Sequence, residues 1–448
     1  MLAAAALSLT PSCDFGPAWH RVEAPHLQGA SVWSYEVELL PQGELDVAAV
    51  FLSPPGPLGV DDAARPFVRD VGSDPDGRRV RYRFALREAA EKLMDPETAI
   101  SAGDAWIAPP STWLMHPAQP GPGTFRLHVV THPPETFAAG THPAADGSPD
   151  TYEAPTSALD DASFAAFGAL SLQTVTEGAA RVEVAVAPRG LELTPAEAAG
   201  WVARSVHAIA AYAGRFPAPR TLVVIMNGKP GNPTRGETLG EGGPAVLIRA
   251  QEGIDDTATR DDWVVTHELL HVALPSLSHE HVWLSEGIPS YVEPIARARV
   301  GLTTPEKVWL DLVKGLPQGL PEPGDEGLER THTWGRTYWG GSLFCLVADV
   351  RIRERTANAH SFDDVVRALV ASGADVESHW EIGRVLEAGD RATGTDVLAS
   401  LYREMALAPG TVDLTSLWKS LGVAVDGGRV SFDDGAPLAP VRRGIAGR

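Results

Sequence analysis

The chain has 448 residues, 44% of them hydrophobic, which is more than one hydrophobic core usually fills, so we expect two or three domains. Its formal net charge of −21 has the sign of nucleic acids and of anionic membranes, which argues against both as partners. Only Cys13 and Cys345 occur, so any metal site must use histidine and carboxylate ligands.

The first residues form an apolar run, Met1 to Leu9, that is followed by Thr10-Pro11-Ser12-Cys13. Residues 1–13 resemble the end of a bacterial lipoprotein signal, although no Lys or Arg precedes Cys13. We expect export, to a periplasmic, lipid-anchored or secreted location, with Cys13 as the lipid anchor. The alternative is an apolar N-terminal stub. No later apolar stretch reaches the roughly 18 residues of a membrane-spanning helix, so no transmembrane span is expected.

Residues 14–160 are predicted to form a β-rich domain and linker. Tyr35, Val37 and Leu39 alternate with glutamates, which is the period-two pattern of a half-buried strand, and a similar alternation runs from Val80. The Asp76-Gly77 pair just before Val80 is a hairpin-turn signal. The pattern favours a sandwich-like domain of about 120 residues. Residues 131–161 are rich in Pro, Gly and Asp and are predicted to form a linker or long surface loop.

Residues 161–376 are predicted to form a second domain, and residues 377–448 a helical C-terminal extension. A strand at 182–186 is followed by a helix that Thr194, Pro195 and Glu197 mark with a capping box. The apolar run 222–226 predicts a buried strand, 227–244 a Gly/Pro-rich loop, and Ala245 to Ile248 an edge strand. Helices are predicted at about 261–274, 286–299, 305–314, 338–356, 362–371 and 394–421, with a final strand at 430–432.

The motif that carries chemistry is the string Thr266-His267-Glu268-Leu269-Leu270-His271, whose apolar flanks, including Trp263, fit a buried helix. His267 and His271 are four residues apart, just over one helical turn, so both rings face one ion. Glu268 is rotated by about 100 degrees and reaches a water on the metal without binding it. Zinc lowers the pKa of such a water to about 7, and the carboxylate takes its proton. The alternative is a helix with two buried or salt-bridged histidines.

Glu286 supplies a third ligand at the expected start of a second helix, in the setting Trp283-Leu284-Ser285-Glu286-Gly287. Two histidines and one glutamate leave a fourth position open for water, which is the catalytic arrangement of zinc. We therefore expect one Zn²⁺ per chain, bound by His267, His271 and Glu286. His279 and His281 in the intervening loop are alternative ligands, but we expect them to be surface histidines.

These motifs resemble the gluzincin metallopeptidases, and most closely their glycyl-aminopeptidase-like family. The resemblance rests on His-Glu-Leu-Leu-His at 267–271, on Trp-Leu-Ser-Glu-Gly-Ile-Pro-Ser-Tyr-Val-Glu at 283–293, and on Tyr338-Trp339-Gly340-Gly341-Ser342. It continues into Ser361-Phe362-Asp363-Asp364, where a later helix opens. It implies an α+β fold: an N-terminal β-rich sandwich-like domain and a thermolysin-like catalytic domain with a small sheet and a mainly helical half.

The resemblance also implies roles for further residues. Tyr338 matches a tyrosine that donates a hydrogen bond to the oxyanion of the tetrahedral intermediate; the alternative is that it simply starts a helix. Gluzincins lay the substrate along an edge strand, for which Gly240 to Ile248 is the candidate here. The remaining candidates are Glu237 and Glu241 as ligands of a substrate amine, or parts of a flexible acidic loop, and Asp261, Asp262 and Glu293 as carboxylates that orient the histidines.

Three departures from the family bear on the substrate. Only 14 residues separate His271 from Glu286, which trims the loop over the metal. Gly340 replaces a lysine that often follows the tyrosine, and no PDZ-like module is recognisable near the C-terminus. None of these removes a metal ligand.

The sequence therefore predicts an enzyme, a zinc-dependent peptidase of aminopeptidase-like type that acts on peptides or proteins. Glu268 is the expected base and Tyr338 the expected oxyanion donor. A catalytically silent zinc-containing surface protein that binds peptides is the first alternative, and an intact Glu268 argues against it. A zinc hydrolase of non-peptide amides or esters is the second. The oligomeric state does not follow from the sequence.

Overall fold

The computed structural model describes residues 31–159 and 162–446. The lipoprotein-like segment and Cys13 lie outside these residues. The described chain forms two compact units. The N-terminal unit contains the described residues up to 175, with 181–199 and 220–255, and the C-terminal unit contains 176–180, 200–219 and the residues from 256 onward. The predicted domain boundaries at 160/161 and 376/377 remain predictions.

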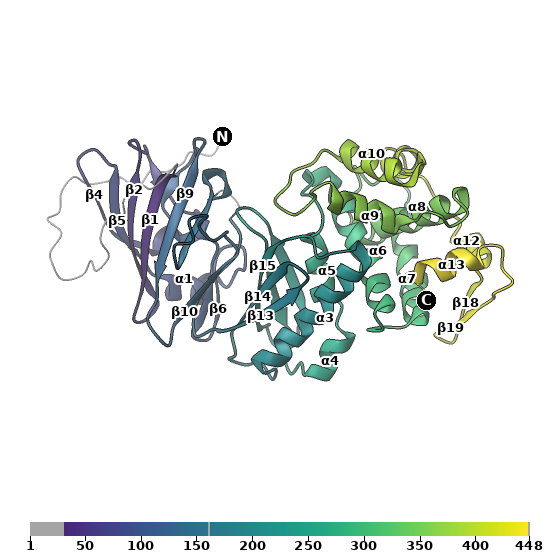
Figure 1. Ribbon diagram of the computed structural model, residues 1–448, viewed down its shortest axis with the longest axis horizontal. Helices are drawn as coiled ribbons and strands as arrows, with labels where there is room; N and C mark the ends of the chain where they lie inside the picture. Colours follow the sequence, from purple (N-terminus) through teal and green to yellow (C-terminus); the bar gives the residue numbers. More distant parts are fainter. Residues whose placement is uncertain (1–30, 160–161, 447–448) are drawn as a thin grey trace. The chain divides into compact units, whose positions relative to one another are not determined.

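A six-stranded sheet opens the N-terminal unit, in the order β11-β9-β1-β2-β5-β4 (Figure 1). Its central strand β1 pairs antiparallel with β2 and parallel with β9. The predicted turn before Val80 is confirmed, because the Gly77 amide donates to the Asp74 carbonyl at 2.9 Å between β4 and β5. The strands are β1 (Ser31–Leu40), β2 (Glu44–Phe51), β3 (Leu58–Gly59), β4 (Val68–Ser73), β5 (Arg79–Phe84), β8 (His116–Pro117), β9 (Thr124–Val130) and β11 (Thr151–Pro155); short helices α1 (Leu86–Leu93) and α2 (Pro110–Trp113) lie between them.

A second sheet, β10-β12-β7-β6, completes the predicted sandwich. Its strands are β6 (Ile100–Ala102), β7 (Ala105–Ile107), β10 (Thr136–Ala139) and β12 (Ala165–Gly168). Trp106 and Phe167 share a core with Tyr35 and Phe125 of the first sheet. The prediction of a linker at 131–161 is wrong, because β10 and β11 lie inside it and pair with β12 and β9.

The third sheet has the order β13-β14-β15-β17-β16, with β14, β15 and β17 parallel. Its strands are β13 (Ser171–Glu177), β14 (Ala180–Val186), β15 (Arg220–Asn227), β16 (Arg235–Leu239) and β17 (Ala245–Ala250). Two predictions fail here. β16 forms inside the expected loop 227–244, and β17 pairs with β15 on one side and β16 on the other, so it is not an edge strand. Its backbone therefore lacks the open edge on which a substrate strand would pair.

Helices dominate the rest of the chain, as predicted (Figure 1). The capping box at the start of α3 is confirmed, since the Glu197 amide donates to Thr194 Oγ1 at 3.3 Å and the Thr194 amide to Glu197 Oε2 at 2.8 Å. The helices are α3 (Pro195–Ala213), α4 (Asp256–Asp261), α5 (Val264–His271), α6 (Val282–Arg299), α7 (Pro305–Gly315), α8 (Gly341–Arg355), α9 (Phe362–Ala371), α10 (Ile382–Thr393), α11 (Val397–Leu401), α12 (Leu414–Leu421) and α13 (Ala439–Ala446), with the hairpin β18 (Val423–Asp426) and β19 (Arg429–Phe432).

Four predicted helices differ from the structure. α6 begins at Val282 and not at Glu286, and the expected helix 394–421 is interrupted, with α11 and a π-helical turn ending at Ala406 and α12 beginning at Leu414. The expected helix 261–274 is observed as the shorter α5, which begins at Val264 and ends at His271, while a separate helix, α4, ends at Asp261. Between the two helices, the Asp262 carboxylate accepts the Val264 amide at 2.9 Å. The expected helix 338–356 is preceded by a π-helical turn, η5 (Gly335–Gly340), and α8 begins only at Gly341. Such turns carry one more residue per hydrogen-bonded ring than an α-helix.

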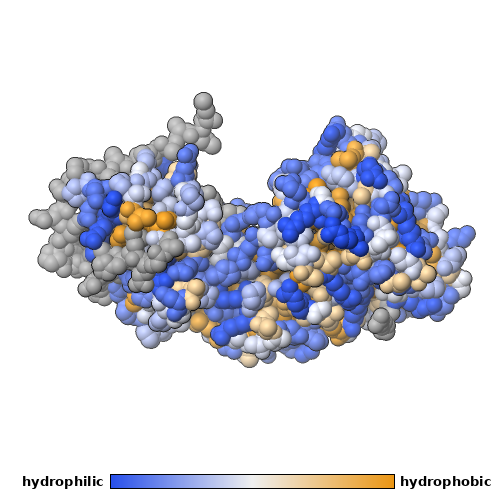
Figure 2. Space-filling view, turned by 45° about the horizontal axis from the view of Figure 1, so that its top comes forward, coloured by the Kyte–Doolittle hydropathy of each residue, from blue (hydrophilic) through white to orange (hydrophobic). Residues whose placement is uncertain are grey.

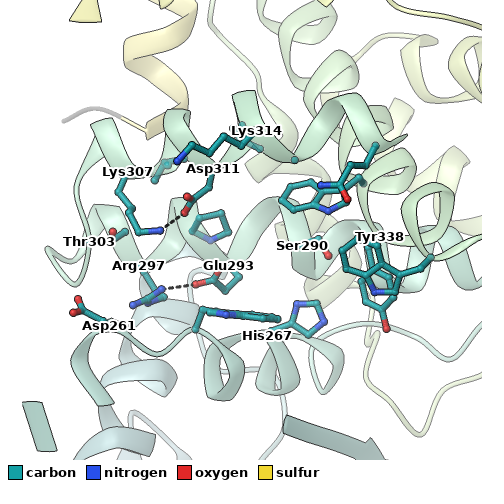
Figure 3. A pocket seen from close by; sticks show the side chains of 18 residues that line it. Asp261, His267, Ser290, Glu293, Arg297, Thr303, Lys307, Asp311, Lys314 and Tyr338 are labelled. Atoms are coloured by element: carbon teal, nitrogen blue, oxygen red, sulfur yellow. Dashed lines mark hydrogen bonds and ion pairs between the residues drawn. The ribbon is translucent and has the colours of Figure 1, made fainter. Parts of the chain in front are cut away.

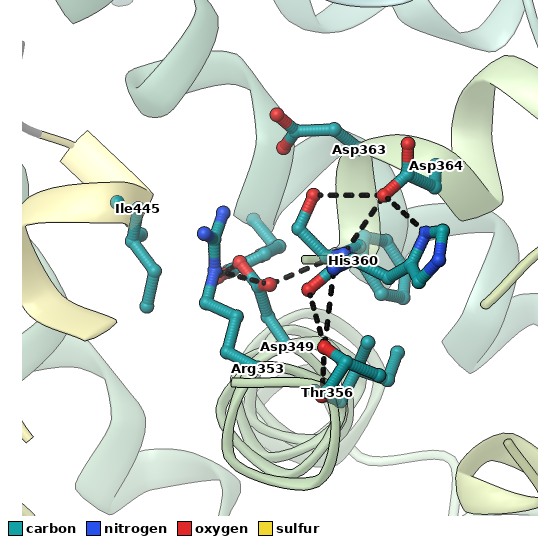
Figure 4. Close-up of polar contacts among 12 residues, drawn as sticks. Asp349, Arg353, Thr356, His360, Asp363, Asp364 and Ile445 are labelled. Carbon is teal, nitrogen blue, oxygen red and sulfur yellow. Dashed lines mark hydrogen bonds and ion pairs between the residues drawn. The ribbon is translucent and has the colours of Figure 1, made fainter. Parts of the chain in front are cut away.

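A buried carboxylate, Asp349 on α8, joins three helices of the C-terminal unit (Figure 4). It accepts hydrogen bonds from Tyr291 Oη on α6 at 2.8 Å, from Arg353 Nε at 2.8 Å and from the Phe362 amide at 2.9 Å. Because a buried charge is costly unless its oxygens are paired, this network defines how α6, α8 and α9 pack.

The face of the described residues that is seen in Figure 2 is largely hydrophilic. Figure 2 shows hydrophobic residues in small groups among hydrophilic ones. No helix among residues 31–159 and 162–446 has both the length and the apolar composition to cross a membrane.

Candidate active site

Helix α5 presents the two histidines of the motif. Val265 and Leu269 are fully buried, and Thr266 Oγ1 donates to Ser205 Oγ at 2.9 Å, so two adjacent faces of the helix are anchored in the protein. His267 and His271 then share the remaining face, with ring centroids 5.0 Å apart. Trp263 is the exception to the predicted buried flank, because its side chain is 50% exposed.

Glu286 lies in the first turns of α6, where Trp283 and Leu284 are buried and seat the helix. For one histidine of the preceding loop, the predicted surface exposure is wrong. His279 is exposed as expected, but His281 is buried, with its Nδ1 2.8 Å from Glu329 Oε2. Trp283 Nε1 also donates to this carboxylate, at 3.3 Å. Glu329 therefore draws His281 into the protein and away from the surface.

The three predicted ligand atoms converge on one point. Glu286 Oε2 is 3.2 Å from His267 Nε2 and 3.5 Å from His271 Nε2. His267, His271 and Glu286 are also the only group of three or more histidine, cysteine and acidic residues among the described ones whose ligand atoms all lie within 4.8 Å of one another. Neither of the alternative histidines, His279 and His281, belongs to this cluster.

The electrostatics of the cluster favour a charged carboxylate. Burial by itself would raise the pKa of Glu286, but the attraction of His271 and hydrogen bonds from both histidines lower it far below its usual range. Burial by itself would lower the pKa of His271, yet Glu286 and then Glu268 raise it. The cluster thus keeps an anionic oxygen between two imidazoles, and a second carboxylate, Glu268, acts on His271.

Tyr338 lies beside the cluster, in the π-helical turn η5. Its ring is stacked on that of His267 at a centroid distance of 6.5 Å and an interplanar angle of 30°. Burial, followed by the charges of Glu286 and Glu268, raises the pKa of Tyr338 to about 12. The phenol therefore keeps its proton at neutral pH and is available as a hydrogen-bond donor.

A glycine contact brings Glu286 and Tyr338 together. A Cβ on Gly287 of α6 would lie 2.5 Å from the Gly341 Cα of α8, and a Cβ on Gly341 would lie 1.9 Å from the Trp283 carbonyl oxygen. The two backbones therefore meet directly, one residue after Glu286 and three residues after Tyr338. No other residue type allows this approach.

A cavity of about 490 Å³ opens beside His267 (Figure 3). His267 and Tyr338 line one end of it. At the other end lie two ion pairs, Arg297 with Glu293 at 2.8 Å and Lys307 with Asp311 at 2.5 Å. Its apolar lining includes Trp263, Trp334, Trp339, Pro294, Val308 and Leu312.

Sequence reasoning missed this cavity. Trp263 and Trp334 are 50% and 62% exposed and are among the few large apolar side chains of the described residues that are so accessible. Tryptophan is enriched at binding interfaces, but whether a given tryptophan is exposed depends on the fold and is not visible in the sequence.

The carboxylates that were predicted to orient the histidines do not contact the free nitrogen of the His267 ring. His267 Nδ1 is buried without a hydrogen-bond partner among the described residues, so Asp261, Asp262 and Glu293 do not orient this ring. Asp262 Oδ1 accepts the Val264 amide, and Glu293 pairs with Arg297. Asp261 is exposed.

Glu237 and Glu241, the candidates for an amine ligand, belong to the N-terminal unit. The Glu237 carboxylate pairs with Arg249 of the neighbouring strand at 2.5 Å. A role in binding a substrate amine stays a prediction for both residues.

No protein-family model and no curated protein sequence matches the chain. Solved structures do: an aminopeptidase N family protein from Idiomarina loihiensis is similar with a TM-score of 0.65 at 13% identity, over 88% of this chain and 79% of that chain. Yeast LTA4 hydrolase follows at 0.53 and 13%, over 88% and 70%. A two-domain M1 zinc metallopeptidase mutant bound to L-arginine gives 0.50 and 14%, over 86% and 96%. The chain has the fold of these three proteins. The predicted α+β fold class is thereby confirmed.

Within this fold, the ligand cluster fits a zinc ion. Nitrogen and oxygen ligands lie about 2.0–2.2 Å from zinc, so two ligands of a tetrahedral site are about 3.4 Å apart. The oxygen of Glu286 lies 3.2 and 3.5 Å from the two imidazole nitrogens, which matches that spacing. Two imidazoles and a carboxylate are also the donor set of catalytic zinc sites.

Proposed function

We propose that the protein is a zinc-dependent, aminopeptidase-like peptidase in which His267, His271 and Glu286 hold one Zn²⁺. The observation that carries this proposal is the convergence of the three ligand atoms within 4.8 Å of one another. A zinc ion bound there would act as a Lewis acid toward a peptide carbonyl and make water a better nucleophile at neutral pH.

Glu268 would serve as the base. It follows His267 directly on α5, is half-buried, and its charge contributes to the raised pKa of both His271 and Tyr338. Its carboxylate would take a proton from the attacking water and pass it to the nitrogen of the leaving amine. Tyr338 Oη would donate a hydrogen bond to the oxygen on which negative charge develops, a role that its high pKa supports.

The cavity beside His267 and Tyr338 would take a part of the peptide next to the scissile bond. Its volume of about 490 Å³ lies in the usual range of small-molecule sites, and its tryptophans offer apolar contact area. The solved structures of this fold include an aminopeptidase N family protein, which supports a peptide as the substrate and removal of N-terminal residues as the reaction.

The substitution Glu268→Gln tests the mechanism. It keeps the shape of the side chain but removes the base, so we expect hydrolysis of a mixed peptide library to fall by at least about 100-fold. Zinc content, measured by plasma emission spectrometry, should stay near one per chain. Products should be N-terminal residues released from free but not from acetylated peptides.

Glu322→Gln is the matched control, because Glu322 is exposed and lies outside the ligand cluster. It should leave hydrolysis unchanged. Full activity in Glu268→Gln would refute the role of this residue. Peptide binding without turnover in the zinc-loaded parent protein would instead favour the silent peptide-binding alternative, and cleavage limited to non-peptide amides or esters would favour the other hydrolase.

A further inference from the structure

The N-terminal unit contains a second cavity, of about 510 Å³. Its wall comes from the end of β15 and the loop that follows, from the turn after β14, from Arg249 on β17 and from the segment around β6. The cavity is large enough for a small organic molecule. None of its lining residues belongs to the metal cluster.

The charge of this cavity is opposite to that of the chain. The lining includes Arg189, Lys229, Arg235 and Arg249, and it includes no aspartate or glutamate. The chain as a whole has 58 acidic and 37 basic residues. In a chain with more acidic than basic residues, a cavity wall with four basic side chains and no acidic one is unexpected. Together these four cations produce a local positive potential.

Nearby carboxylates neutralise only part of this charge. Arg249 pairs with Glu237 at 2.5 Å, and Arg189 lies 3.6 Å from Asp104 in an exposed pair that solvent screens. Lys229 and Arg235 are exposed, and neither has an ion pair with any of the described residues. Arg249 Nε is a buried donor without a hydrogen-bond partner in the same part of the chain, so a donor is left for a ligand.

The position of the cavity is a second, independent argument. Strands β14, β15 and β17 are parallel, and Arg189, the Asn227–Pro233 stretch and Arg249 stand at or beyond their carboxyl ends. In open sheets with parallel strands, ligands bind in the crevice outside the carboxyl ends of the strands, where connecting loops diverge. Arginine guanidinium groups suit planar recognition of phosphate and carboxylate groups.

We propose that this cavity binds a small oxyanion with more than one negative charge, carrying phosphate or carboxylate groups. Arg249 and Arg189 form its sides, and Lys229 and Arg235 hold the anion at the mouth. This site is separate from the proposed peptidase chemistry and does not depend on it.

Calorimetric titration of the full chain with inorganic pyrophosphate and, separately, with citrate tests the proposal at constant ionic strength. We expect binding of at least one of the two at one site per chain, and the two arms tell a phosphate-bearing from a carboxylate-bearing ligand. The double variant Lys229→Gln/Arg235→Gln should weaken this binding by roughly tenfold or more, because each cation lost removes a charge-assisted contact. Both residues are exposed, so folding should be retained.

The control double variant is Lys419→Gln/Arg429→Gln, which removes the same charge at exposed positions outside the cavity. It should keep the affinity of the parent protein. The proposal is wrong if neither anion binds, if the first double variant binds as tightly as the parent, or if both double variants lose affinity equally, since an equal loss would mean attraction to net charge alone. Peptide hydrolysis by the first variant should be unchanged.

Discussion

Among single residues, Glu293 is the titrating group with the clearest expected effect on stability. Burial raises its pKa from the ordinary 4.5 to about 7, although Arg297 at 2.8 Å acts in the opposite direction. Because the folded-state pKa is the higher one, its contribution to stability is full below about pH 4.5 and is lost as the pH rises through about 7. The loss is of the order of 3 kcal/mol.

Denaturant unfolding of the parent protein and of Glu293→Gln between about pH 5 and 8 measures this effect. The free energy of unfolding of the parent should fall relative to the variant as the pH rises. Glu322→Gln, at an exposed position, should follow the parent at every pH. Parallel curves for the parent and Glu293→Gln would contradict the raised pKa.

The cluster of His267, His271 and Glu286 was predictable because each of its steps is local: a four-residue spacing on one helix and a third ligand at the start of the next. The surroundings of those residues were not. His281 is buried against Glu329, which lies far along the chain and which no local pattern connects to it. Trp263 lines the cavity and is 50% exposed, although its apolar flank predicted burial.

At the scale of elements, the contact between α6 and α8 depends on two glycines. Gly341→Ala places a methyl group 1.9 Å from the Trp283 carbonyl oxygen, so the helices must separate. We expect a loss of roughly 1–3 kcal/mol in the free energy of unfolding, or more. Zinc affinity and hydrolysis should fall with it, because Glu286 and Tyr338 lie on either side of this contact.

Gly383→Ala in α10 is the matched control, since a Cβ there meets no atom within 4 Å. It should be neutral or stabilise the protein by up to about 1 kcal/mol, because alanine has a higher helix propensity than glycine. Equal unfolding midpoints for the two variants in guanidinium would show that the helices absorb the added methyl group at no cost.

The elements that sequence reasoning missed share one cause. β10, β11 and β16 lie in stretches rich in Pro, Gly and polar residues, where local propensity predicts loops. They become strands because a partner strand supplies backbone hydrogen bonds, as β17 does for β16. The helices were predicted more accurately, because helix caps and apolar helix faces depend on residues that are close together in the sequence.

At the scale of the whole molecule, bound zinc should contribute to stability, because an ion that binds only the folded chain shifts the equilibrium by mass action. The gain is roughly 4 kcal/mol when free zinc exceeds its Kd by about a thousandfold. A chelator should therefore lower the Tm of the parent protein, and added zinc should restore it. His271→Ala should show neither response. A chelator-insensitive Tm in a zinc-loaded parent would count against a metal that bridges α5 and α6.

The general architecture followed from the sequence, because alternation, capping boxes and the metal motif each predict one part of an α+β protein with a β-rich beginning. The grouping of the sheets did not. The five-stranded sheet shares a core with β6, β7 and β12 through residues such as Ile107, Phe164 and Leu222. This core is built from residues far apart in the chain. A prediction made segment by segment assigns those residues to different domains.

The π-helical turn η5 makes the site sensitive to residue number as well as residue type. Tyr338 lies inside this turn, upstream of α8, and one extra residue in the ring sets its direction relative to the helix that follows. A single-residue deletion here would restore α-helical register and rotate the phenol by about 100° from its present direction, even with every side chain intact. Homologues of this chain should therefore tolerate substitutions near Tyr338 more readily than insertions or deletions.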